Sequence, residues 1–247
     1  MKKRIVAFLA CLLAAAAVTP ALASFETDAT IPAFGKFKLS NVQTYDTALP
    51  KRGAKTTKKQ ILNLLNQIPL AIPGSGNTLY TYSLYFIRAV KGDYYEAGVT
   101  RKWIGKKPTY MEERNLKNPA GTNCSIDTEN KSSWIYYSWK KGASQGLKFT
   151  YQKTGVGTPQ APKASDFKLY KDAKVLGQKC MVYSYFVKAE NSTYYKYVSR
   201  KTGWNLKTVI FDGTGLIRCR LDFSVKNVTK PSSFFKPPAR VTFIKGI

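Results

Sequence analysis

Acidic side chains at a spacing that could flank a scissile bond are scarce in this sequence. Glu112 and Glu113 are adjacent, and neighbouring residues on a strand point to opposite faces, so this pair cannot act on one bond. Asp127 and Glu129 would share a face if their segment were extended, but we interpret the segment as a loop. The chain contains no histidine, which excludes the commonest general base and the Ser–His and Cys–His nucleophile pairs.

Motifs for phosphate, metal and redox chemistry are missing as well. Gly155-Val156-Gly157 is followed by Thr158-Pro159 rather than by a helix, so it does not form a phosphate-binding loop. There is no Cys-x-x-Cys, and without histidine a zinc or redox site is not expected. Composition leaves a Ser–Lys dyad open, although no Ser-x-x-Lys stands in a suitable context. We therefore expect no catalytic residue, no metal and no cofactor in a protein that is not an enzyme.

The first residues have the pattern of a cleavable signal peptide. The basic Met1-Lys2-Lys3-Arg4 precedes an apolar run, and Ala21-Leu22-Ala23 supplies the small residues of a cleavage site before Ser24. The run is short for a retained membrane anchor. We expect a signal peptide at 1–23, an N-terminal extension at 24–56 and one domain at 57–247, exported to the periplasm or cell envelope.

Three cysteines remain after the leader, and an oxidising compartment permits one disulfide among them. Cys180 and Cys219 lie in strand-like segments with a hairpin between them, so they are not expected to be neighbours. A bond between Cys124 and Cys180 is one interpretation, and three buried free thiols is the other.

Positive charge dominates the composition. The chain has 40 Lys and Arg against 14 Asp and Glu, a formal charge of +26. Removing Lys2, Lys3 and Arg4 with the leader lowers the basic count from 40 to 37 and leaves +23. Such a charge favours anionic lipid head groups or cell-envelope polymers, or it serves only as a solvated surface. We do not expect an exported protein to bind nucleic acid.

The sequence predicts one amphipathic helix. Thr57-Lys58-Lys59-Gln60 forms a capping box, and Ile61, Leu64, Leu65 and Ile68 follow at helical spacing until Pro69 ends the run.

Short strands make up the remainder. Their residues are rich in Tyr, Trp, Val, Ile and Thr, and Gly-, Pro- or Lys-rich turns separate them. The ranges expected are Thr78–Val90, Tyr94–Ile104, Thr109–Asn115, Ser133–Trp139, Leu147–Gln152, Phe167–Tyr170, Lys179–Val187, Tyr194–Arg200, Leu206–Phe211 and Leu216–Val225. Phe34 to Leu39 is a further short edge strand. Short connections favour an antiparallel meander, and a sheet of about ten strands must curl, split or close. The predicted fold is mainly β (α+β): a curled antiparallel sheet that forms an unclosed half-barrel, with a helix over its concave face.

Four short motifs, in this order, resemble the periplasmic lipoprotein carrier (LolA-like) superfamily. They are Gly105-Lys106-Lys107-Pro108-Thr109-Tyr110; Asp127 through Lys131 to Trp134-Ile135-Tyr136; Thr202-Gly203-Trp204-Asn205-Leu206-Lys207 leading to Asp212-Gly213-Thr214-Gly215; and Phe234-Phe235-Lys236-Pro237-Pro238. The resemblance implies an unclosed β-barrel whose concave apolar face holds acyl chains beneath a helical lid. In the carriers an arginine precedes the proline of the first motif, whereas this chain has Lys107.

Two functions follow from these patterns. The first is an exported carrier that shelters the acyl chains of a lipid or lipoprotein in an apolar cavity. We expect this carrier to be a monomer, to bind an anionic membrane surface and not to bind nucleic acid. The residues predicted to line its cavity are Tyr82, Leu84, Phe86, Tyr95, Val99, Trp103, Trp134, Tyr136, Phe149, Tyr183, Tyr185, Phe211, Leu221 and Phe223. The alternative for each of them is an ordinary place in the hydrophobic core. The basic rim of the cavity is Arg101, Lys106 and Lys107. The second is a protein with a filled core that binds anionic envelope polymers through surface cations, namely Lys51, Arg52, Lys55, Lys58, Lys59, Arg101, Lys102, Lys106, Lys107, Lys140 and Lys141.

Overall fold

The structure is a computed structural model of the chain, and it describes residues 28–31, 35–38, 49–89, 95–105, 109–116, 122–153 and 163–246. The predicted signal peptide lies outside these residues. Within them, no helix is long and apolar enough to cross a membrane.

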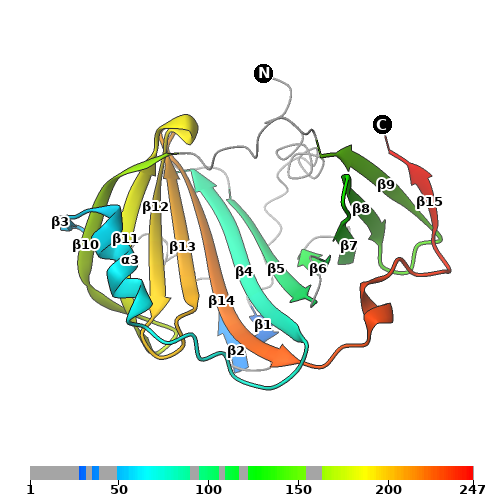
Figure 1. Cartoon of the computed structure of the whole chain (residues 1–247), viewed down its shortest axis with the longest axis horizontal. Coiled ribbons are helices and arrows are strands. Elements are labelled where there is room, and N and C mark those ends of the chain that lie inside the picture. Colours follow the sequence, from blue (N-terminus) through cyan, green and yellow to red (C-terminus); the bar gives the residue numbers. More distant parts are fainter. Residues whose placement is uncertain are drawn as a thin grey trace.

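One large sheet dominates the described residues (Figure 1). Its strands are β3 (Ala54–Lys55), β4 (Thr78–Ala89), β5 (Tyr95–Ile104), β6 (Thr109–Leu116), β7 (Thr122–Glu129), β8 (Ser133–Lys140), β9 (Gln145–Gln152), β10 (Ala164–Val175), β11 (Gln178–Val187), β12 (Ser192–Ser199), β13 (Asn205–Asp212), β14 (Leu216–Val228) and β15 (Thr242–Lys245). Strands β1 (Asp28–Ile31) and β2 (Gly35–Lys38) pair in a separate hairpin. The helical elements are α3 (Lys58–Asn66), η1 (Lys188–Glu190) and η2 (Ser232–Phe235).

The sheet consists of two antiparallel meanders joined at one seam. Strands β4 to β9 form the first meander and β10 to β14 the second, and the first strand of one pairs with the last strand of the other. This seam runs from Leu216 opposite Ala89 to Val228 opposite Thr78, with a bulge between Asp222 and Ser224. The outermost strands β3 and β15 do not pair with each other, so the curved sheet stays open (Figure 1).

Residue alternation gives the sheet two faces. One face, which we call the core face, carries the fully buried Val182, Val209 and Leu221, and Leu84 and Cys219 pack with them. The residues before and after them on each strand point to the opposite face, which we call the groove face. A second cluster on the core face lies farther along the first meander, where Phe243 of β15 packs edge to face against Tyr137 and Trp139, at 5.1 and 5.8 Å between ring centroids.

Helix α3 begins as the capping box predicts. The backbone N–H of Gln60 donates to Thr57 Oγ1 at 3.2 Å, and the backbone N–H of Thr57 donates to Gln60 Oε1 at 2.9 Å. Ile61 is buried and the helix contacts β10, crossing in front of this end of the sheet in Figure 1. Just before the helix, Ala54–Lys55 pairs with β10, so the end of the expected extension at 24–56 contributes an edge strand.

All ten predicted strands of the sheet are present, and the prediction of an unclosed, curled, mainly β fold with a helix is confirmed. Strands β3, β7 and β15 of the large sheet and strand β1 of the hairpin were not predicted. The most important is β7, because the segment with Asp127 and Glu129 was interpreted as a loop and is a strand. The sheet is also mixed rather than purely antiparallel, since β15 runs parallel to β9. The short strand expected from Phe34 to Leu39 pairs with β1 instead of joining the large sheet.

The expected bond between Cys124 and Cys180 is not found. Cys124, Cys180 and Cys219 are buried free thiols. Cys124 belongs to the cluster around Trp139, whereas Cys180 belongs to the cluster around Val182. The two residues lie on strands β7 and β11, at different ends of the sheet. The alternative prediction of three buried thiols is therefore what the structure has.

Candidate functional site

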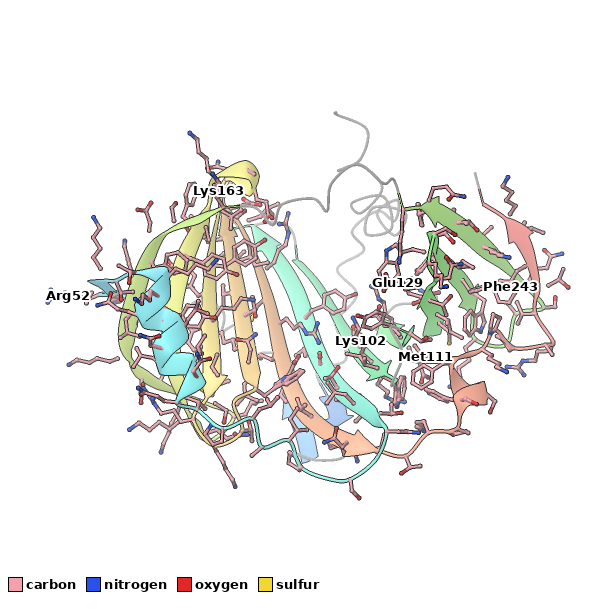
Figure 2. The ribbon with its side chains drawn as sticks, viewed as in Figure 1. Arg52, Lys102, Met111, Glu129, Lys163 and Phe243 are labelled. Atoms are coloured by element: carbon pink, nitrogen blue, oxygen red, sulfur yellow. The ribbon has the colours of Figure 1, made fainter. Side chains whose placement is uncertain are left out.

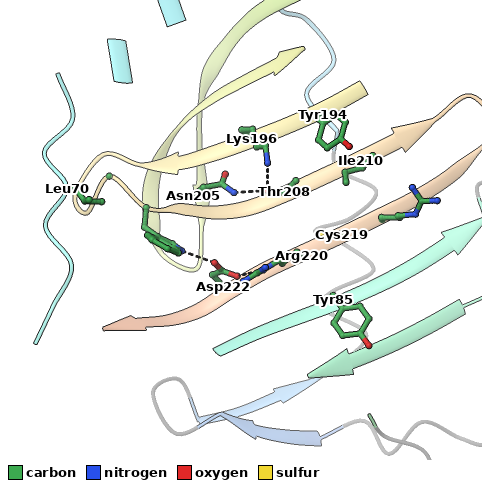
Figure 3. A pocket seen from close by; sticks show the side chains of 13 residues that line it. Leu70, Tyr85, Tyr194, Lys196, Asn205, Thr208, Ile210, Cys219, Arg220 and Asp222 are labelled. Atoms are coloured by element: carbon green, nitrogen blue, oxygen red, sulfur yellow. Dashed lines mark hydrogen bonds and ion pairs between the residues drawn. The ribbon is translucent and has the colours of Figure 1, made fainter. Parts of the chain in front are cut away.

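A groove of about 660 Å³ opens on the groove face, where the two meanders meet. Its floor comes from β4, β12, β13 and β14, and the segment after α3 and the turn before β13 close one end (Figure 3). Its volume is typical of small-molecule sites, which measure roughly 300–1,000 Å³. The lining residues are Leu70, Tyr85, Tyr194, Lys196, Gly203, Trp204, Asn205, Thr208, Ile210, Arg218, Cys219, Arg220 and Asp222.

Strand register arranges the floor in two rows. In the first row Lys196, Thr208, Arg220 and Tyr85 are successive cross-strand partners. In the second row Tyr194 pairs with Ile210, and Ile210 pairs with Arg218. Directly opposed residues on neighbouring strands are close enough for their side chains to interact. The register therefore places three cations around Thr208 and Ile210, with tyrosine rings at both sides.

Asp222 holds one end of this floor in place. Its carboxylate is buried and accepts hydrogen bonds from Ser83 Oγ at 2.6 Å, Arg220 Nε at 2.8 Å and Trp204 Nε1 at 2.7 Å. A second nitrogen of Arg220 donates to Ser83 Oγ at 3.1 Å. Charge-assisted bonds of this kind are the strong ones, so the network fixes the seam between β4 and β14 and the indole that borders the groove (Figure 3).

Lys196 is a half-buried cation at the middle of the groove. Its Nζ donates to Thr208 Oγ1 at 3.2 Å, and Asn205 Nδ2 donates to the same oxygen at 2.6 Å. It also lies 5.7 Å from the centroid of the Tyr194 ring. Burial, together with the charge of Arg220, lowers the pKa of Lys196 below its ordinary value, against the opposing effect of Asp222.

A row of aromatic rings lies next to the groove, on the same face of the sheet. Tyr185 stacks on Tyr194 with 5.2 Å between ring centroids and an interplanar angle of 5°. Tyr183 and Phe167 flank Tyr185 at 6.3 and 5.8 Å. Burial raises the pKa of Tyr183 to about 12, so its hydroxyl stays protonated at neutral pH. This row offers flat apolar surface with neutral polar edges.

The end wall of the groove depends on a close backbone contact. The backbone N–H of Ala71 donates to the carbonyl of Thr202 at 3.0 Å. Gly203 has a φ of +69°, and a Cβ there would lie 2.7 Å from the carbonyl oxygen of Pro69. This approach brings Leu70, which is largely exposed to solvent, to the edge of the groove.

None of the eleven predicted lining residues whose side chains the structure describes lines this groove. Tyr82, Leu84, Leu221 and Phe223 are buried in the cluster on the core face. Trp103 and Phe211 share that face by register, opposite Tyr80 and Ile217. The structure thus divides the predicted set between the two sides of the sheet.

The remaining predicted lining residues lie on the groove face or outside the described side chains. Tyr183 and Tyr185 belong to the aromatic row beside the groove. Trp134, Tyr136 and Phe149 also lie on the groove face, on β8 and β9, where Tyr136 and Phe149 are 6.1 Å apart. The side chains of Phe86, Tyr95 and Val99 are not among those described.

Of the predicted basic rim, only Arg101 is described. Its guanidinium lies 5.4 Å from the Tyr82 ring centroid and 3.9 Å from Glu113, on the core face and away from the groove. Lys106 and Lys107 lie outside the described residues. Other cations extend into solvent, for example Arg52 and Lys163 (Figure 2).

Chemistry that needs a cluster of ligands finds no support in the described part of the chain, where no group of three His, Cys, Asp or Glu side chains could hold a metal ion. Asp127 and Glu129 do share the groove face, since β7 is a strand. Glu129 is ion-paired with Lys153, and neither acid lines the groove.

Fold and site together define a curled, open β-sheet protein with a mixed apolar and basic groove. No protein-family profile and no curated protein sequence matches the chain. Similar solved structures include an uncharacterised conserved protein from Thermus thermophilus (11% identity, TM-score 0.49, 77% of this chain and 100% of that one). Another is a LolA superfamily protein from Nitrosomonas europaea (8% identity, TM-score 0.33, 74% and 98%). A third is a lipoprotein-sorting domain from Vibrio parahaemolyticus (8% identity, TM-score 0.32, 68% and 90%). The superfamily that the sequence motifs resemble is thus among the similar solved structures.

Proposed function

We propose that the protein is an exported, non-enzymatic binding protein that holds the acyl chain of a lipid or lipoprotein in the groove between its two meanders. The observation that carries the proposal is the groove itself, which lies open on a sheet whose opposite face is filled. A signal peptide at 1–23 and a periplasmic or envelope location belong to the same proposal, and they rest on the sequence pattern.

The side chains of the groove suit a long apolar ligand. Leu70, Ile210, Tyr194, Tyr85 and Trp204 offer apolar surface. Burying a chain against them contributes roughly 0.8 kcal/mol per methylene, so one long chain supplies tight binding. The sequence resemblance to lipoprotein carriers supports the same class of ligand.

A pair of neighbouring residues on β13 provides the test. Ile210 lines the groove, whereas Phe211 points to the opposite face. Ile210→Trp adds bulk inside the groove, and Phe211→Trp is the matched control. We expect full-length, delipidated protein to bind a fluorescent C16 fatty acid, with affinity reduced at least about tenfold by Ile210→Trp, the loss of about 1.4 kcal/mol. Equal affinities of both variants and the wild type would place acyl binding elsewhere.

Binding of anionic envelope polymers by the basic surface is the second candidate, and the formal charge of +26 favours it. Salt separates the two functions, because the Debye length falls to about 3 Å at 1 M. Polymer binding is expected to disappear at 1 M salt. A lipid co-purified in the groove is expected to survive that wash and to be seen by native mass spectrometry.

A further inference from the structure

The groove contains one cation that forms no direct ion pair with a carboxylate in the described structure. Of its three cations, Arg220 pairs with Asp222 at 2.8 Å and Arg218 pairs with Asp212 at 3.5 Å. Lys196 takes part in no ion pair among the described residues. Its ammonium group donates to the hydroxyl of Thr208 and lies over the Tyr194 ring, and Asp222, already paired with Arg220, attracts it only at longer range. A half-buried ammonium group without a counter-ion is costly unless a partner is supplied from outside the fold.

The position of Lys196 shows where such a partner would sit. It faces Arg220 across Thr208 in the first row of the floor, two strand spacings or roughly 10 Å apart at the backbone. Arg218 lies two residues from Arg220 on the same face. Long basic side chains from these positions can converge on one small anion, and the apolar Ile210 and Tyr194 lie beside them in the second row.

We propose that Lys196, flanked by Arg218 and Arg220, binds the acidic headgroup of an acylated ligand, a carboxylate or a phosphate, while the chain lies along the apolar wall. This inference rests on the proposed function and narrows it. It predicts that the groove binds anionic lipids more tightly than neutral acyl esters of the same chain length.

The electrostatics of the groove agree with this assignment. Desolvation and the neighbouring charge of Arg220 lower the pKa of Lys196, because both disfavour the ammonium form. Asp222 and Asp212 face these cations, but Asp222 already accepts a hydrogen bond from Arg220 and Asp212 is ion-paired with Arg218. A bound anion would offset the desolvation of Lys196 and raise its pKa again.

The test compares three ligands that share one chain and differ in the headgroup: hexadecanoate, hexadecyl phosphate and hexadecanol. Each is titrated below its aggregation concentration into full-length, delipidated protein. The variant is Lys196→Met, which keeps an apolar stem and removes the charge. The control is Lys226→Met, because Lys226 also contacts a tyrosine ring, Tyr80 at 5.6 Å, but lies on the core face of β14.

We expect wild type and Lys226→Met to prefer both anions over hexadecanol by at least about tenfold, the contribution of one charge-assisted hydrogen bond. Lys196→Met is expected to abolish this preference and to leave the hexadecanol affinity within about threefold. Tighter binding of the phosphate points to phospholipids as the source, and tighter binding of the carboxylate points to free fatty acids; either result supports the site.

Three results would overturn it. If wild type binds hexadecanol as tightly as the anions, or if Lys196→Met keeps the preference, the headgroup site is wrong while the acyl groove stands. If wild type binds none of the three ligands, the proposed function fails and this site fails with it. Circular dichroism and thermal melting of each variant confirm that the compared proteins are folded.

Discussion

Replacing Asp222 with asparagine should destabilise the protein more than any change at a surface acid of similar geometry. The carboxylate is 4% exposed and accepts from Ser83, Arg220 and Trp204. An amide of the same shape keeps one acceptor oxygen and turns an NH2 group toward either the indole N–H of Trp204 or the Nε–H of Arg220, neither of which can accept. The substitution therefore leaves at least one buried donor without an acceptor and removes the negative charge that pairs with Arg220.

The magnitude can be worked out from these bonds. Removing one partner of a fully buried ion pair costs about 3–5 kcal/mol, but the Arg220 side chain is 46% exposed, so water recovers part of its share. We expect Asp222→Asn to lower the free energy of unfolding by about 2–4 kcal/mol. For a domain of this size each kcal/mol lowers Tm by about 2–4 °C.

Urea unfolding followed by tryptophan fluorescence measures the loss, with Asp172→Asn as the control. Asp172 accepts two bonds from Arg200, at 2.7 and 2.8 Å, near the surface, and exposed pairs contribute about 0.2–1 kcal/mol. A loss below about 1 kcal/mol for Asp222→Asn, or equal losses for the two variants, would refute the reasoning. In the double variant Asp222→Asn/Arg220→Met the loss should be smaller than the sum of the single losses, because the two residues act as one unit.

Three further predictions concern other parts of the fold. Gly203→Ala should lower the free energy of unfolding measured in urea by about 1 kcal/mol or more, because the φ of +69° and the contact with Pro69 disfavour a Cβ. An unchanged urea midpoint of unfolding would contradict this. The hydrogen bonds from Arg200 lower the pKa of Asp172, so its contribution to stability is present above the unfolded pKa of about 3.9 and is lost as pH falls through the lower folded value. The gap between wild type and Asp172→Asn should close on acidification, and a gap that is independent of pH would argue against the pair. Phe243→Ala should lower the free energy of unfolding by about 2 kcal/mol, because it removes edge-to-face and apolar contacts. Hydrogen exchange should speed up more in β15 and β9 than in β12.

Apolar alternation predicted the strands well because it records burial. Strand β14 shows this, since Cys219 and Leu221 are buried and their periodicity marks the strand. Strand β7 was missed because its polar positions interrupt that pattern, while β3 and β15 are too short, at 2 and 4 residues, to show a period. Strands so short are specified by their partners rather than by their own residues.

The groove could not be found by the same signal. Apolar periodicity identifies the side of a strand that packs, and on β14 that side is the filled core face. The groove face carries Arg218 and Arg220 instead, which read as solvated charge. The sequence did contain a usable signal. Tyr194 and Lys196 are two residues apart on one strand, and Arg218 and Arg220 are two residues apart on another, so each strand carries two such side chains on one face. Recognising it as one site requires the register, which brings β12, β13 and β14 together.

The seam between β4 and β14 has a consequence for how the molecule is made. Residues 78–89 must pair with residues 216–228, so this ladder cannot close until the chain as far as residue 228 is available for folding. Contacts so distant in sequence form slowly, and the walls of the groove come from both sides of the seam. We therefore expect the groove to be completed after each meander has formed its local hairpins.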